Sequence, residues 1–348
     1  NITLLNSYFE AISGFTSTGF TIFENIKQLD ESLILWRSTS QWIGGIYFLF
    51  SILLLIDIFD KNLKQSFTEY LSFNYNEIFK IWTAEMLKNG SKLVVSAHGG
   101  AMRGKHEVFL HEEKICDYKV TWCMPHHDKH VQLSPTKVLK KNNFPGKGNN
   151  VTLIGCDFPR YSYRVQSYPT SSLILEDFNQ KVEFIKLLNT FKLPNFSLKI
   201  RPYPDRGWCL KDRYIDIFGS KTMSTQKTLK AEFSVSKLII CAYPQTTFFE
   251  SMQSGIPTVL LYVEKYWELE ECFKQLVRHL IRAKIVHTNS ISAAMHIKNI
   301  YTDPHSWWNK DQTKEARLMF DKVCGVPSED ISIDKEFHEF LMNISNKK

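Results

Sequence analysis

The chain has 348 residues, of which 43% are hydrophobic and 14% aromatic, so it is long enough for more than one domain and too apolar to be mainly disordered. Its formal net charge of +7 favours anionic partners such as nucleotide diphosphates or a membrane face. Because both signs of charge are mixed along the chain and no long basic run interleaves with aromatic residues, no nucleic-acid partner is expected.

The first distinctive stretch is a short apolar segment at residues 9–15 that runs into threonine, serine and glycine. It is too short to cross a bilayer and predicts a re-entrant loop at membrane depth. Ion filters are built from backbone carbonyls in such loops, and glycine permits the backbone angles that aim those carbonyls at an ion. The candidate filter residues are Thr16, Ser17, Thr18 and Gly19.

Residues 38–56 contain no charged side chain and are bounded by Arg37 and Asp57. A stretch of this length can cross the hydrocarbon core of a bilayer as a helix. The alternative is a buried core helix, but the flanking charges and the Gly44–Gly45 pair favour a membrane segment. We therefore expect a transmembrane helix here.

These first segments resemble a known transporter family. ThrSerThrGlyPheThr at 16–21, LeuIleLeuTrpArgSer at 33–38 and GlnTrpIleGlyGly at 41–45 are similar to one pore repeat of the Trk/Ktr potassium-uptake family, over residues 1–58. That family surrounds its pore with four such repeats, and the sequence shows no second filter downstream, so one repeat is not expected to close a pore. The chain also begins at Asn1 without the features of a signal peptide, so residues 1–60 are interpreted as a fused or truncated transporter fragment.

Beyond residue 61 the pattern changes to short β-rich apolar runs separated by helical stretches. The runs lie at residues 92–96, 151–155, 197–201, 237–241 and 258–262. Apolar runs without alternation are typical of strands buried on both faces of a parallel sheet that is covered by helices. The expected fold class is therefore α/β, with doubly wound, Rossmann-like lobes.

A polar stretch at residues 133–150, rich in lysine, asparagine, proline and glycine, predicts a linker between two such lobes. The preceding part, residues 61–140, has room for only part of a Rossmann-like domain, so the first lobe is expected to be incomplete. Residues 150–348 have enough strands and helices for a complete C-terminal lobe.

The strand at 92–96 leads directly into His98, Gly99 and Gly100. Active groups in α/β proteins commonly follow a strand's carboxyl end, where glycines let a ligand approach the backbone. His98 is the candidate catalytic base, because imidazole accepts a proton near neutral pH, although a structural histidine in a glycine turn is the alternative. His111 and Glu112 are weaker candidates for substrate binding, and a surface helix start would also explain them.

The seven cysteines are scattered from Cys116 to Cys324 without a CxxC pair, which predicts reduced thiols in a cytoplasmic setting. One local group of possible metal ligands comprises Cys123, His126, His127, Asp128 and His130. It lacks the second paired element of structural zinc sites, so a polar loop is preferred and no metal is expected.

A second basic and aromatic loop follows the strand at 197–201. Arg201 and Arg206 lie in LysIleArgProTyrProAspArgGlyTrp, and an arginine at a strand end can hold phosphate oxygens with its planar fork. The alternative is a solvated basic turn.

The most informative segment, residues 237–261, reads as strand, helix and strand. Thr247 and Glu250 have the spacing of a capping box, which would satisfy the free amides at the start of the helix. The same amides and the helix dipole also favour an anion, and Thr246 adds a hydroxyl donor. Gln245, Thr246, Thr247 and Glu250 are therefore the candidate diphosphate-binding residues.

Residues 77–345 resemble GT-B glycosyltransferases, and more closely a family of transferases found in gene clusters for O-antigen and related surface carbohydrates. The resemblance runs from PheLysIleTrpThrAlaGlu at 79–85, through HisGlyGly at 98–100 and HisGluGluLysIleCysAsp at 111–117, to AlaArgLeuMetPhe at 316–320. It implies a nucleotide-sugar donor on the second lobe, a carbohydrate acceptor activated near His98, and neither metal nor other cofactor. It also implies a cytoplasmic enzyme, attached to the inner membrane if residues 38–56 span it.

Two alternatives to a transferase remain at this point. The chain could be a fragment of a potassium transporter with its filter at residues 16–21, or a nucleotide- or carbohydrate-binding module without catalysis. The transferase resemblance covers far more of the chain than the transporter resemblance and is therefore preferred.

Overall fold

The computed structural model describes most of the chain, and the ranges are residues 3–16, 21–23, 29–59, 65–69, 77–97, 99, 102–105, 111–135, 148–157, 160, 171–325 and 333–346. It divides into two compact units. One comprises residues 1–66 and 76–91, and the other residues 67–75 and 92–348.

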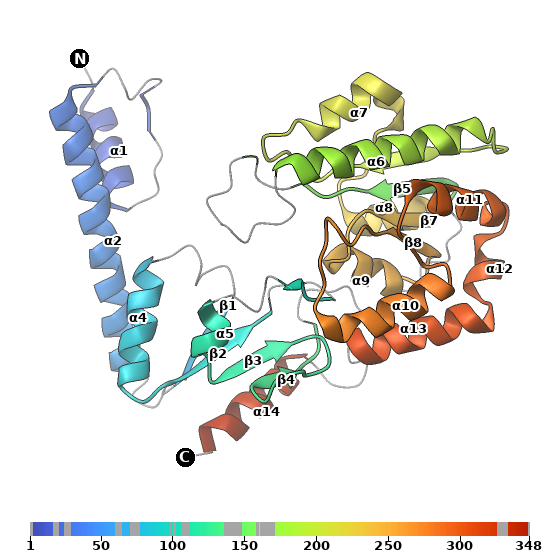
Figure 1. Ribbon diagram of the computed structural model, residues 1–348. Coiled ribbons are helices and arrows are strands. Elements are labelled where there is room, and N and C mark those ends of the chain that lie inside the picture. The colour runs from blue at the N-terminus through green and yellow to red at the C-terminus, as the bar shows by residue number, and fades with distance from the viewer. Residues whose placement is uncertain are drawn as a thin grey trace. The chain divides into compact units, whose positions relative to one another are not determined.

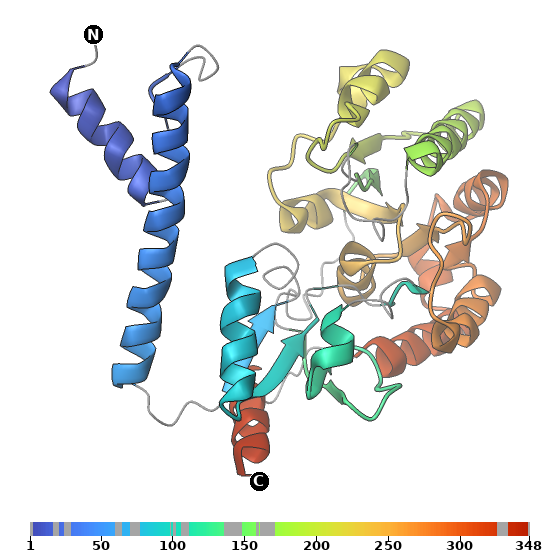
Figure 2. The ribbon, with the colours of Figure 1, turned by 60° about the vertical axis from the view of Figure 1, so that its left-hand side comes forward.

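The first unit contains α1 (Leu4–Phe15), α2 (Glu31–Phe59) and α4 (Glu77–Lys88). Figure 2 shows α1 lying beside α2. A buried ion pair between Glu10 and Arg37 joins the two helices. Gly44 is required at their contact, because a Cβ atom there would lie 1.6 Å from the carbonyl oxygen of Phe15.

The structure confirms a helix over residues 38–56, within α2, but not a membrane span. Among the described residues, no helix is both long and apolar enough to cross a membrane, so the predicted transmembrane segment is unsupported. Of the predicted filter, Thr16 ends α1 and donates its hydroxyl to the carbonyl of Ile12 at 2.8 Å. Ser17, Thr18 and Gly19 lie outside the described residues.

The second unit begins with a four-stranded sheet in the order β1-β2-β3-β4. Its strands are β1 (Gln65–Glu69), β2 (Lys92–Ser96), β3 (Tyr118–Thr121) and β4 (His130–Gln132), and α5 (His111–Ile115) precedes β3. The β2–β3 and β3–β4 pairs are parallel. Only β2 was anticipated as an apolar run.

The chain's last helix, α14 (Ile333–Asn346), returns to this sheet, although its sequence position places it with the second lobe. Ile344 is buried with Val94 and Val120 of the sheet, and the ring of Phe340 meets that of Tyr118 edge-on at 5.9 Å. We call residues 92–133 with α14 the first lobe, and residues 148–325 the second lobe.

The second lobe is built on a five-stranded sheet in the order β6-β5-β7-β8-β9, in which every pair is parallel. Its strands are β5 (Asn150–Ile154), β6 (Leu198–Arg201), β7 (Ser236–Cys241), β8 (Thr258–Leu261) and β9 (Val286–His287). The first four match the apolar runs predicted from the sequence to within one residue at each end. The predicted α/β class with a parallel sheet is confirmed.

Helices cover both faces of this sheet, with α6 on one and α9 on the other (Figure 1). They are α6 (Ser171–Thr190), α7 (Leu210–Phe218), η3 (Ser220–Thr222), α8 (Leu229–Val235), α9 (Thr246–Gln253), η4 (Glu271–Phe273), α10 (Lys274–Arg282), α11 (Ser290–Ile300), α12 (Pro304–Trp308) and α13 (Asp311–Cys324). Side chains of Thr228, Asn289 and Asp303 cap α8, α11 and α12 by accepting backbone amides.

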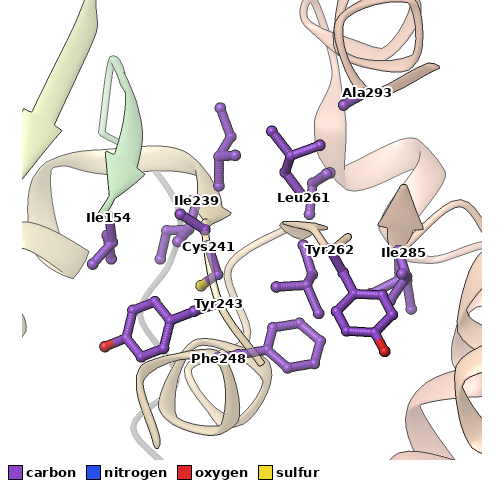
Figure 3. Close-up of a cluster of buried hydrophobic side chains, with 14 of the residues drawn as sticks. Ile154, Ile239, Cys241, Tyr243, Phe248, Leu261, Tyr262, Ile285 and Ala293 are labelled. Carbon is purple, nitrogen blue, oxygen red and sulfur yellow. The ribbon is translucent and has the colours of Figure 1, made fainter. Parts of the chain in front are cut away.

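The core of this lobe lies between the sheet and its helices. Ile239 and Leu261 on the central strands pack with Phe248 of α9 and Ile285 before β9 (Figure 3). Burial of such side chains contributes roughly 1.5–3 kcal/mol each relative to exposure. The sheet is therefore a rigid base for the loops at its carboxyl edge.

The two lobes meet through Trp122, which follows β3. Its ring lies 5.6 Å from that of Phe249 in α9, and the amide of Met124 donates to the carbonyl of Val323 at 2.8 Å. The first lobe's Gly104 also forms a bridge with Leu269 of the second. The loop after β3 is therefore anchored on both lobes.

Candidate active site

The strand order of the second lobe places a topological switch point at the carboxyl ends of β5 and β7. From β5 the chain crosses to β6 on one side, whereas from β7 it crosses to β8 on the other. The connecting segments diverge at this point, and doubly wound proteins bind their ligands in the crevice that results. The crevice is bordered by residues 155–157 after β5 and 242–247 after β7.

The turn at the end of β7 carries the predicted anion-binding residues. Ala242 is tied to β5 through its amide, which donates to the carbonyl of Ile154 at 3.1 Å. Gln245 is the extended residue that precedes α9, and α9 begins at Thr246. The first turn of the helix therefore opens beside the crevice, where its partial positive charge favours an anion.

The predicted capping box between Thr247 and Glu250 is not formed. A capping box requires its threonine at the extended position before the helix, but Gln245 occupies that position and Thr247 lies inside the first turn. The hydroxyl of Thr247 instead pairs with that of Tyr243 at 2.5 Å. The capping role expected for these two side chains is thus wrong, and the side chain of Gln245 makes no capping hydrogen bond either.

Burial governs the protonation of two groups beneath the turn. It raises the pKa of Glu250 to about 7, so this carboxyl is partly neutral at physiological pH. Burial also raises the pKa of Tyr243, whose phenol stays protonated and available as a hydrogen-bond donor. Figure 3 shows the Tyr243 ring at the border of the apolar cluster with its oxygen turned away from Phe248.

Gly99 brings the first lobe to the same turn. A Cβ atom at Gly99 would lie 2.6 Å from the hydroxyl oxygen of Thr246, so the two residues are neighbours and a larger residue at position 99 would displace this hydroxyl. Ala97, two residues before Gly99, is fixed because its amide donates to the carbonyl of Val120 at 2.8 Å. His98 and Gly100 lie outside the described residues. Gly99 and the threonine turn, predicted separately, are thus placed together.

The two predicted arginines differ in their surroundings. The guanidinium of Arg201 donates to the carbonyls of Gln226 (2.6 Å) and Lys227 (3.3 Å) and lies 3.6 Å from the buried carboxylate of Glu232. The Arg201 side chain thereby stabilises the loop before α8. Arg206 instead lies exposed over the ring of Tyr203, with 5.2 Å from its guanidinium carbon to the ring centre.

The backbone of Arg206 connects the loops after β5 and β6. Its amide donates to the carboxylate of Asp157, which is buried, at 2.9 Å. The amide of Arg160 donates in turn to the carbonyl of Arg206 at 3.0 Å. The loop that carries Arg206 is therefore fixed to the β5 side of the crevice.

His111 and Glu112 open the short helix α5 and point in different directions. His111 is exposed, whereas Glu112 is fully buried, and neither of its carboxylate oxygens has a hydrogen-bond partner among the described residues. No contact within the described part of the chain joins either residue to the threonine turn. Their predicted role in substrate binding stays a prediction.

An ionic network around Glu113 of α5 was not predicted from the sequence. Glu113 lies 2.9 Å from the ammonium of Lys119, 3.5 Å from Nη1 of Arg103 and 3.5 Å from Nε2 of His130. Arg103 also reaches the second lobe, where its Nη2 atom lies 3.1 Å from Glu270. The only local signal was the adjacent pair of glutamates, because the partners come from distant segments.

We expect Glu113 to make the protein sensitive to acid. Burial alone would raise the pKa of Glu113, but the hydrogen bond to His130 and the charges of Lys119 and Arg103 lower it from 4.5 to about 2. Because the pKa is lower in the folded than in the unfolded chain, the ionised Glu113 stabilises the folded state fully above about pH 4.5. This stabilisation is lost as the pH falls from there towards 2. The stability difference between wild type and Glu113→Gln should therefore shrink over that interval in urea titrations.

The matched control for this experiment is Glu339→Gln, which removes a carboxylate exposed on α14. Its stability difference from wild type should be small and nearly independent of pH. A wild-type minus Glu113→Gln difference that stays constant between pH 6 and 3 would contradict the assigned network.

A cavity of about 580 Å³ lies one strand beyond the crevice, beside the loop that follows β8. Its lining residues come from both lobes: Lys105, His126, His127, Glu264, Lys265, Glu268, Leu269, Glu270, Glu271, Cys272 and Lys274. Of the cysteine and histidine group considered in the sequence, Cys123 and His130 are buried, whereas His127 and Asp128 are exposed. His126 faces the cavity.

Comparison with known families decides the class of the protein. The family model of the LIC12162 family transferases matches residues 56–331, which is most of the chain. The chain belongs to this family of transferases. The predicted enzyme class is confirmed. The match covers residues 92–133 of the first lobe and all of the second lobe, and it ends before α14.

Curated relatives match only a short stretch. The potassium uptake protein TrkI of the Trk system in Halomonas elongata is 47% identical over 45 residues, 13% of this chain and 9% of TrkI. An uncharacterized cation transporter of Methanocaldococcus jannaschii is 40% identical over 42 residues, 12% of this chain and 9% of that protein. The chain thus spans about a tenth of these transporters, and transport by the chain is not supported.

Solved structures with some likeness include TarM and a complex of MnaA with UDP from S. aureus. TarM is 11% identical, with a TM-score of 0.47, over 84% of this chain and 57% of TarM. MnaA is 10% identical, with a TM-score of 0.42, over 93% of this chain and 89% of MnaA. At these values neither similarity carries an argument about function.

Proposed function

We propose that this transferase is a glycosyltransferase that moves a sugar from a nucleotide-activated donor to a hydroxyl of a carbohydrate acceptor, in the synthesis of a surface polysaccharide. In the reaction, the bond between the sugar's anomeric carbon and the diphosphate oxygen breaks. A bond from that carbon to the acceptor oxygen forms. The acceptor's proton goes to a base, and the nucleoside diphosphate leaves.

The proposal rests on one observation: Gly99 of the first lobe lies next to Thr246 of the second lobe, beside the crevice. A donor diphosphate at the start of α9 would meet backbone amides, a helix dipole and the hydroxyls of Thr246 and Thr247. These groups stabilise the charge that develops on the leaving diphosphate. The first lobe contributes its glycine segment within reach of the same atoms.

Roles for the remaining candidates follow from this placement. His98, directly before Gly99, is the proposed base, because it adjoins the residue that approaches Thr246. Arg206 is exposed at the neighbouring loop and can extend to a phosphate, whereas the Arg201 guanidinium is held by backbone carbonyls and positions the loop before α8. No cofactor besides the activated donor is required by this scheme.

Nucleotide binding tests the proposal. Calorimetry on the full chain with UDP, GDP, CDP and CMP should reveal a preferred nucleotide, and Thr246→Ala/Thr247→Ala should weaken its binding at least tenfold. A hydrogen bond to a charged group contributes about 1.5–3 kcal/mol, and about 1.4 kcal/mol corresponds to a factor of ten. Thermal melting of the same variant separates lost binding from lost stability, because Thr247 also pairs with Tyr243.

Thr190→Ala is the matched control, since Thr190 ends α6 at the opposite edge of the sheet. Within the described part of the chain, its hydroxyl bonds only the carbonyl of Leu187 in its own helix. This variant should leave binding unchanged. If no nucleotide binds folded wild type, or if the double variant binds as tightly, the donor site is not at this turn.

A further inference from the structure

A histidine, a glutamate and a cysteine converge where the lobes meet, and the proposed transfer reaction does not use them. His126 lies in the first lobe between β3 and β4, and Glu270 and Cys272 lie in the second lobe at η4. One donor atom of each, Nε2, a carboxylate oxygen and Sγ, lies within 4.8 Å of the other two. The Oε2 atom of Glu270 is 3.9 Å from Nε2 of His126 and 3.8 Å from Sγ of Cys272.

The imidazole of His126 is oriented as a metal ligand. Its Nε2 atom is buried and has no hydrogen-bond partner among the described residues. This nitrogen lies 3.9 Å from Oε2 of Glu270, so it is placed to offer its lone pair to an ion bound between them.

The carboxylate of Glu270 is fixed through its Oε1 atom. Arg103 holds Oε1 at 3.1 Å, and the amide of Glu270 donates to the carbonyl of Arg103 at 3.0 Å. The other oxygen, Oε2, accepts the thiol of Cys272 at 3.8 Å and lies 3.9 Å from Nε2 of His126. Metal-binding side chains are commonly hydrogen-bonded or ion-paired to a second group in this way, which fixes their orientation.

Access to the cluster is provided by the 580 Å³ cavity, which all three residues line. Cys272 is exposed, so a metal ion can arrive from solvent without unfolding of the chain. Three protein ligands with a solvent-filled space beside them match sites that keep one coordination position for water or substrate.

We propose that His126, Glu270 and Cys272 bind one divalent transition-metal ion of the zinc class between the two lobes. A nitrogen, a thiolate and a carboxylate suit a borderline-soft ion. On binding, the thiol of Cys272 forms the sulfur–metal bond and releases its proton, and the two negative ligands balance the ion's charge. The proposal does not depend on the proposed glycosyl transfer.

Metal titration of the full chain tests the site directly. Zinc should bind metal-free protein with one ion per chain, and its presence should raise the melting temperature, because the ion joins ligands from two lobes only in the folded state. Cobalt(II) used in place of zinc should develop a near-ultraviolet charge-transfer band from the thiolate. A chain that binds no zinc, or binds cobalt without a thiolate band, would overturn the assignment.

Variants identify the ligands. Cys272→Ser and His126→Ala should each weaken zinc binding about 100-fold or more, since even outer partners of metal ligands contribute about 10- to 100-fold. Cys209→Ser and His338→Ala remove an exposed cysteine and an exposed histidine elsewhere and should bind zinc like wild type. If the control variants lose as much affinity as the ligand variants, or if neither ligand variant loses any, the site is refuted. Melting without metal verifies that each variant is folded.

Discussion

Replacing Arg103 by alanine should destabilise the protein by about 3–5 kcal/mol, because it breaks the buried ion pairs of Arg103 with two carboxylates. The Arg103 side chain is only 9% exposed and contacts Glu113 at 3.5 Å and Glu270 at 3.1 Å. Glu113 belongs to the first lobe and Glu270 to the second. Urea unfolding, followed by tryptophan fluorescence, measures the change.

Lys105→Ala is the matched comparison, because it removes a neighbouring cation that also pairs with the loop after β8. Lys105 is 68% exposed and lies 3.7 Å from Glu268, and exposed pairs contribute about 0–1 kcal/mol. Arg103→Ala should therefore be much less stable than Lys105→Ala. Equal stabilities of the two variants would show that the buried network does not hold the lobes.

Truncation of Trp122 to alanine is expected to cost about 3–5 kcal/mol, the usual range for a large buried aromatic side chain. The residue is 2% exposed, and its ring contacts that of Phe249 in the other lobe. Its carbonyl accepts from the side chain of Gln132 at 2.8 Å, so the backbone on both sides of the ring is fixed. The loss should appear in thermal melting and as faster proteolysis of the polar stretch between the lobes.

Trp122→Phe keeps an aromatic ring in the same place and should lose clearly less stability than Trp122→Ala. If both variants lose equally little, the ring does not contribute to packing between the lobes. If the alanine variant melts lower without any change in proteolysis, Trp122 stabilises one lobe rather than their junction.

Candidate site residues were chosen from the sequence where they follow a strand directly. The glycine at position 99 and the threonines at 246 and 247 were chosen because they come after buried apolar runs, and the structure places Gly99 beside Thr246. The ionic network could not be predicted in this way, because Arg103, Glu113 and Glu270 are brought together by separate elements. The capping box failed for a related reason, since the first residue of α9 is set by how the turn from β7 packs.

The sequence by itself determined the parallel α/β class of this protein. Runs such as 238–241 and 259–262 are apolar at every position, and only a strand covered on both faces buries such a run completely. Strands β3 and β4 lack this pattern because they bury Lys119 and His130, which lie 2.9 Å and 3.5 Å from the carboxylate of Glu113. Local apolarity therefore identifies strands whose neighbours are apolar and misses strands whose neighbours are charged.

Only the tertiary structure decided the strand order, the return of α14 to the first sheet, and the meeting of residues from both lobes. The order β6-β5-β7-β8-β9 places the crevice between β5 and β7, yet each strand's own sequence is compatible with any neighbour. Ile344 packs with Val94 and Val120, which are distant from it in the sequence. Such pairings depend on which apolar faces remain uncovered once the local elements have formed, and this is a property of the assembled unit rather than of any one segment.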